Sequence, residues 1–125
     1  MNLLVVLEPG EASVEEVLAP LRWTLDRRGE AGLGLTVAVV GPTGGPEAHA
    51  AEDGARELLR AAGRPEAVRR LAGDPEREVL RLLGREGFDE LALSGGTRTP
   101  AGKIRPGRLA ERLLLNAPVT LTLVR

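Results

Sequence analysis

The sequence has no cysteine and no tyrosine, and it has one histidine, one phenylalanine and one tryptophan in 125 residues. Without cysteine the chain can form no disulfide, thiol nucleophile or thiolate metal site. The scarcity of aromatic rings removes the stacking surfaces on which single-stranded nucleic acids bind. A formal net charge of −1 provides no basic field for a phosphate backbone. We therefore expect no nucleic-acid binding and no metal site.

Long apolar runs are also missing. A membrane-spanning helix needs about 20 apolar residues, whereas the longest apolar run near the start, residues 3–7, has five. A secretory signal would need a basic start and a longer apolar stretch. These absences predict a cytoplasmic protein without a membrane span. Arginine outnumbers lysine sixteen to one, which fits a GC-rich genome and is compatible with a thermophile.

Short apolar runs alternate along the chain with amphipathic helical stretches. Ser13 and Glu16 form a capping box that starts the first helix, and Asp74 followed by Pro75 starts the third. The continuous apolar run at residues 3–7 is typical of a strand buried on both faces. Strands are predicted at residues 3–7, 33–40, 67–71, 88–94 and 119–124, and helices at residues 13–28, 47–62, from 74 onward and 109–116.

This alternation predicts a single α/β domain over residues 1–125, with an open five-stranded parallel sheet and helices on both faces. Such Rossmann-like sheets bind ligands beyond the carboxyl ends of their strands. The longest polar turn follows the fourth strand and reads SGGTRTPAGKIRPG, residues 94–107. Its basic residues Arg98, Lys103 and Arg105, together with Arg108, could bind phosphate through their side chains. Alternatively they are solvated loop charges, or they pair with Glu111 and acidic residues of a partner.

No catalytic constellation is visible in the sequence. The paired carboxylates at residues 15–16 and 76–78 fall in first helical turns, where negative charge favours the helix dipole. The hydroxyl groups of Ser94, Thr97 and Thr99 have no histidine nearby in sequence, and His49 opens the second helix. We therefore predict that the protein is not an enzyme.

Several segments resemble the universal stress protein family. They are Gly73-Asp74-Pro75 before the third helix, FDELAL at residues 88–93, and GRLAERLL, NAPV and LVR at residues 107–125. The resemblance implies strand order 3-2-1-4-5, a relation to the wider adenine-nucleotide α-hydrolase-like group, and a homodimer paired through its fifth strands. The alternating VTLTLV pattern suits an edge strand that needs a partner. The expected dimer edge is Val119, Thr120, Leu121, Thr122 and Leu123.

Family members that bind ATP carry Gly, two residues, Gly, nine residues, then Gly and a small residue. With the last glycine placed on Gly107, Ser94 and Thr97 fall at the other glycine positions, and Arg108 falls at the small residue. Glu8 falls where the family has an aspartate. Candidate nucleotide or phosphate contacts are Glu8, Gly10, Val39, Ser94, Gly95, Gly96, Thr97, Arg98, Lys103, Gly107 and Arg108.

These departures lead to two hypotheses. The first is a non-enzymatic, dimeric stress-response or regulatory binding module without family-type ATP binding. The alternative is a binder of ATP, AMP or phosphate that uses the arginine-rich loop. An enzyme of the hydrolase-like group is a third option, but its SGGxDS-type loop follows the first strand, whereas Ser94-Gly95-Gly96 follows the fourth.

Overall fold

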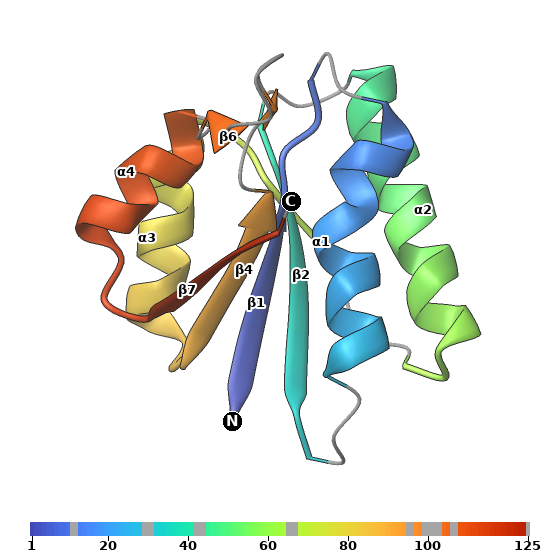
Figure 1. Ribbon diagram of the computed structural model, residues 1–125, viewed down its shortest axis with the longest axis horizontal. Coiled ribbons are helices and arrows are strands. Elements are labelled where there is room, and N and C mark those ends of the chain that lie inside the picture. Colours follow the sequence, from blue (N-terminus) through green and yellow to red (C-terminus); the bar gives the residue numbers. More distant parts are fainter. Residues whose placement is uncertain are drawn as a thin grey trace.

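Five parallel strands form one sheet in the order β3-β2-β1-β4-β7 (Figure 1). The strands are β1 (Asn2–Leu7), β2 (Gly34–Val40), β3 (Val68–Leu71), β4 (Glu90–Ser94) and β7 (Thr120–Val124). The computed structural model describes residues 1–10, 13–28, 32–41, 45–64, 68–94, 97–98, 104–105 and 108–124. The order confirms the predicted 3-2-1-4-5 arrangement.

Two helices cover each face of the sheet (Figure 1). The helices α1 (Val14–Arg27) and α2 (Pro46–Ala61) lie on one face, and α3 (Pro75–Arg85) and α4 (Arg108–Asn116) lie on the other. The predicted caps are present, because Ser13 Oγ accepts from Glu16 N at 3.3 Å and an Asp74 carboxylate oxygen accepts from Arg77 N at 3.0 Å. Within the described segments, no helix is long and apolar enough to cross a membrane.

The core consists of two layers, one on each face of the sheet, and successive side chains of β1 point alternately into one layer and the other. Leu3, Val5 and Leu7 pack toward α1 and α2, whereas Leu4 and Val6 pack toward α3 and α4. All five side chains are buried, as the continuous apolar run predicted. The next residue on the α3–α4 side of the strand is Glu8, which places a carboxylate at the carboxyl end of the sheet.

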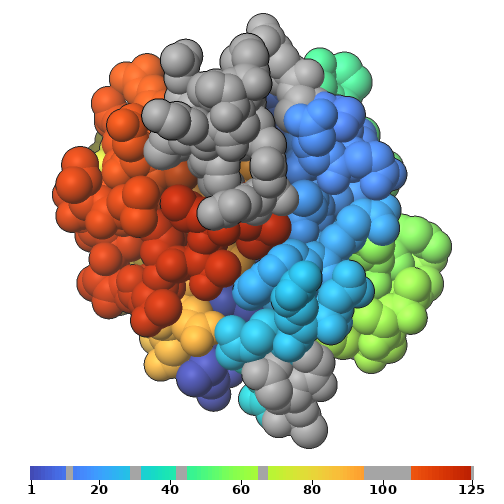
Figure 2. All heavy atoms as spheres, in the orientation of Figure 1, coloured from blue at the N-terminus to red at the C-terminus, as the bar shows by residue number. Residues whose placement is uncertain are grey.

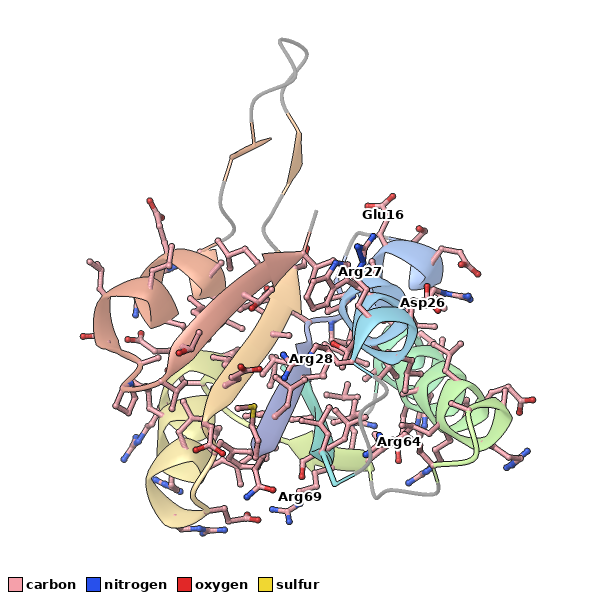
Figure 3. All side chains as sticks on the ribbon, turned by 60° about the horizontal axis from the view of Figure 1, so that its bottom comes forward. Glu16, Asp26, Arg27, Arg28, Arg64 and Arg69 are labelled. Atoms are coloured by element: carbon pink, nitrogen blue, oxygen red, sulfur yellow. The ribbon has the colours of Figure 1, made fainter. Side chains whose placement is uncertain are left out.

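Ion pairs tie the helices and outer strands together. Arg28, just after α1, reaches Glu90 at the start of β4 with N···O 2.6 Å (Figure 3). Glu52 of α2 accepts from Arg70 of β3 at 3.0 Å, and this hydrogen bond is the main reason why the pKa of Glu52 lies below its ordinary value. Edge strand β3 is therefore attached to α2 by side chains as well as by its pairing with β2.

Several predicted boundaries shift in the structure. Phe88 precedes β4 instead of opening it, and Val119 precedes β7. The second helix starts at Pro46 and ends at Ala61, one residue earlier at each end than predicted, and α4 starts at Arg108. Predicted strand residue Ala67 lies outside the described residues. Two short strands were not predicted at all: β5 (Thr97–Arg98) and β6 (Ile104–Arg105) pair antiparallel inside the loop after β4.

Candidate functional site

A pocket of about 210 Å³ opens at the carboxyl end of β1, beside the first turns of α3 and α4. This is the edge where ligands bind in parallel α/β sheets. Charged side chains dominate its wall, and Pro75 and Leu109 add apolar surface. Its lining consists of Glu8, Asp74, Pro75, Glu76, Arg108, Leu109 and Arg112.

Glu8 enters this pocket from the end of β1. The residue as a whole is exposed, yet partial burial of its carboxyl group raises the pKa of Glu8 above its ordinary value of 4.5. Burial raises a carboxyl pKa because it disfavours the charged form. Among the described residues Glu8 has no hydrogen bond or ion pair that would offset this effect. The pocket therefore contains an acid whose charge is unbalanced.

The opposite wall contains an ion pair and a hydrogen bond that join α3 to α4. One carboxylate oxygen of Glu76 pairs with Arg112 at 2.7 Å, and the other accepts from Asn116 Nδ2 at 3.2 Å. The hydrogen bond that Arg112 donates to Glu76 is the main reason why the pKa of Arg112 lies above its ordinary value, and the charges of Glu76 and Asp74 add to the effect. The positive charge of Arg112 is therefore largely committed to its neighbours.

The remaining charged residues in the pocket are Asp74 and Arg108. Asp74 uses one oxygen to cap α3, and Arg108 is the first residue of α4 and is exposed. Arg108 has no ion pair within the described part of the chain. Among the described lining residues, three carboxylates face two guanidinium groups, so this part of the lining has one negative charge in excess.

The loop after β4 forms a hairpin. Thr97 pairs with Arg105 and Arg98 pairs with Ile104, and β5 and β6 project away from the body of the molecule beyond the end of the sheet (Figure 3). A phosphate-binding loop instead wraps its main-chain N–H groups around the anion next to a helix N-terminus. In β5 and β6 the main chain is instead paired between the two strands.

Among the predicted candidates, the structure brings together only Glu8 and Arg108 in the described pocket. Ser94 ends β4 and is exposed. Val39 is 1% exposed in the core under α1 and α2, so its side chain faces away from this pocket. Gly10 is exposed and does not line the pocket. Candidates Gly95, Gly96, Lys103 and Gly107 lie outside the described residues, and Thr97 and Arg98 are described as main chain in β5.

Sequence reasoning missed Asp74, Glu76 and Arg112 as pocket residues. The two acids were interpreted as helix-capping and dipole charges, and Asp74 does cap α3. The signal available was positional, because the first turns of α3 and α4 both follow carboxyl ends of strands. No group of three histidine, aspartate or glutamate residues in the described ranges could hold a metal ion, and His49 is exposed on α2.

Replacement of Glu8 by glutamine is expected to stabilise the protein at neutral pH. A raised carboxyl pKa in the folded state means that the ionised form opposes folding, increasingly so as the pH rises from 4.5 through the folded-state pKa. The amide removes the charge and keeps the shape. Urea denaturation at pH 7 should show a gain in unfolding free energy that disappears below pH 4.5. The control Glu47→Gln, at an exposed position of α2, should give no gain, and an equal gain in both variants would contradict the assignment.

Comparison with known proteins identifies the fold. No protein-family model and no curated protein matches the chain. Among solved structures, a universal stress protein from Archaeoglobus fulgidus aligns with a TM-score of 0.74 at 18% identity over 100% of this chain and 98% of its own. A universal stress protein family member from Arabidopsis thaliana, with AMP bound, aligns with a TM-score of 0.73 at 14% identity over 98% and 90%. The universal stress protein UspA from Lactobacillus plantarum aligns with a TM-score of 0.69 at 15% identity, over 98% of this chain and 97% of its own.

These structural likenesses agree with the resemblance seen in the sequence. The neighbours share the five-stranded parallel sheet with helices on both faces over nearly the whole chain. The chain therefore has the fold of universal stress proteins.

Proposed function

We propose that this protein is a non-enzymatic binding module of the universal-stress type. In this proposal it acts as a homodimer in the cytoplasm, in a stress response or in regulation, and it does not bind ATP as the nucleotide-binding members of that family do. The observation that carries the proposal is the acid-rich pocket at the carboxyl end of β1.

The charge of the pocket opposes a triphosphate. Glu8, Asp74 and Glu76 all line it, and the charge of Arg112 is committed to Glu76 at 2.7 Å. In a partly buried site, like charges repel more strongly than they do in bulk water. A ligand with several negative charges would face the unbalanced carboxylate of Glu8 with Arg108 as the one uncommitted cation of the described lining.

The hairpin supports the same conclusion. The predicted glycine positions of the family loop are occupied by Ser94 and Thr97, and Thr97 is paired with Arg105 in the β5–β6 hairpin. A main chain already paired between two strands has fewer N–H groups to offer to a phosphate.

The open edge of β7 supports the homodimer. In the described sheet β7 pairs with β4 alone, and Figure 2 shows it on the surface between α4 and α1. The main-chain N–H of Thr120 donates to Asp89 O at 3.3 Å, toward β4. Because main-chain groups alternate in direction along a parallel strand, those of Leu121 and Leu123 face the open edge. An unpaired edge of this kind pairs readily with a second copy.

A second candidate function is the binding of an adenine nucleotide or phosphate. It is favoured by the structural neighbour from Arabidopsis, which has AMP bound. It is also favoured by the concentration of basic residues at Arg98, Lys103, Arg105 and Arg108. In this case side chains would replace the main-chain N–H groups of the family loop.

A nucleotide series tests the two candidates against each other. Thermal shifts would be measured with ATP, ADP, AMP and inorganic phosphate, with and without magnesium, on the wild type and on Arg108→Ala. The first candidate predicts no shift with ATP at millimolar concentration. A concentration-dependent shift that is lost in Arg108→Ala, and kept in the distant control Arg60→Ala, would establish the second candidate and overturn the first.

A further inference from the structure

The pocket at the end of β1 contains one acid and one base that have no partner in the described structure. Glu8 and Arg108 both line the cavity, and neither forms a hydrogen bond or ion pair with another described residue, nor with the other. The remaining charged groups are occupied, Asp74 by the cap of α3 and Glu76 by Arg112. Both residues are exposed to solvent, so water solvates their charges until a ligand with complementary groups replaces it.

The pocket is also small. Its volume of about 210 Å³ lies below the roughly 300–1,000 Å³ that is usual for sites of drug-sized ligands. Leu109, which is 4% exposed, and Pro75 provide an apolar wall that could cover a short carbon chain. The size therefore favours a molecule of a few carbon atoms over a nucleotide.

We propose that this pocket binds a small zwitterion, an organic molecule that presents a positively charged nitrogen to Glu8 and an anionic group to Arg108. This inference rests on the proposed function, because it takes the pocket as the binding site of the module. An anion alone would leave Glu8 unbalanced, and the described lining residues already have one excess negative charge. A cation alone would leave Arg108 without a partner.

The pH dependence distinguishes a zwitterion from a simple anion. Among the described residues, the charged groups that line the pocket with Glu8 are the N-cap Asp74 and Glu76 of α3, and Arg108 and Arg112 of α4. Burial raises the pKa of Glu8, so Glu8 loses its charge first as the pH falls. A ligand that is held by its positive nitrogen then binds more weakly, whereas a simple anion binds more tightly.

Three probes with fixed charges test the proposal: taurine, ethanesulfonate and ethylamine. The sulfonate and ammonium groups keep their charges between about pH 4 and 8, so any pH dependence belongs to the protein. Binding would be followed by NMR titration of the full chain, with the amide signals of Glu8 and Arg108 as readouts. We expect taurine to bind at least about tenfold more tightly than either single-charge probe, since each charged hydrogen bond contributes to affinity.

Two variants and their controls complete the experiment. Glu8→Gln should weaken taurine about tenfold and leave ethanesulfonate unchanged or tighter, and Arg108→Gln should weaken taurine without affecting ethylamine. The charge controls Glu47→Gln and Arg60→Gln, both on α2, should change none of these affinities. Taurine affinity in the wild type should fall as the pH is lowered toward 4.5.

Three results would overturn the proposal. In the first, the Glu8 and Arg108 signals do not shift up to the solubility limit of taurine. In the second, ethanesulfonate or ethylamine binds as tightly as taurine does. In the third, Glu8→Gln leaves the affinity for taurine unchanged. An ATP titration on the same sample separates this inference from the proposed function. If ATP binds tightly and taurine still binds, only the proposed function is contradicted. If neither ATP nor taurine binds, only the proposal of a zwitterion site is contradicted.

Discussion

Replacement of Leu113 by alanine is expected to lower the free energy of unfolding by about 3 kcal/mol. Leu113 is 0% exposed on the inner face of α4, where it packs with Leu4, Leu91 and Leu93 of the sheet. Truncation of such a side chain loses its burial and leaves a cavity that the neighbours fill only in part. Domains of this size have a total stability of about 5–15 kcal/mol, so the loss is a large fraction of it.

The same helix supplies a matched control. Leu115 lies two residues away on α4 and is 83% exposed. Leu115→Ala has the same change in helix propensity but removes almost no buried surface, so its effect should stay below about 0.5 kcal/mol. Urea denaturation of both variants at pH 7 would compare them. Equal losses of stability would contradict the orientation of α4 on the sheet.

Introduction of a lysine at Thr122 is expected to convert the proposed homodimer into a monomer. Thr122 lies in the middle of the open edge strand β7, and lysine on edge strands is a common means of preventing sheet-to-sheet pairing. In an antiparallel pair of β7 strands, the added charges of the two copies would lie close together and repel each other. Sedimentation equilibrium should give twice the chain mass of 13.2 kDa for the wild type and 13.2 kDa for Thr122→Lys.

Two further variants make this result interpretable. Thr122→Val keeps the β-branched shape without a charge and should remain a dimer. Thr120→Lys places the lysine at an exposed position of the same strand, where it should weaken the dimer without disturbing the fold. Circular dichroism would verify that each variant is folded. A wild type that sediments as a single chain at high concentration would refute the dimer.

The strands and helices could be predicted from the sequence because the patterns that indicate them are local. The continuous apolar run at residues 3–7 predicted a strand buried on both faces, and Leu4 and Val5 are 0% exposed. The cap residues Ser13 and Asp74 marked two helix starts, and both accept the hydrogen bonds that a cap requires. The resemblance in the segments from Gly73 onward supplied the strand order, which local patterns cannot specify.

The pocket could be predicted from the sequence only in part, because it depends on contacts between segments that are distant in sequence. Glu8 was found because it falls at the position of the family's strand-1 aspartate, and Arg108 because it follows Gly107 at the expected anion position before the fourth helix. The Glu76–Arg112 bridge depends on how α3 and α4 pack side by side, because its two partners lie 36 positions apart in sequence. Strands β5 and β6 were missed because two-residue strands are too short to show a period.

Calorimetric titration of ATP, with magnesium, into the wild-type protein at pH 7 shows whether the pocket lined by Glu8, Asp74 and Glu76 accepts a triphosphate. We expect no saturable heat at millimolar ATP, because the carboxylates of the pocket repel the phosphates. Saturable binding with a micromolar dissociation constant, lost in Arg108→Ala, would contradict this expectation.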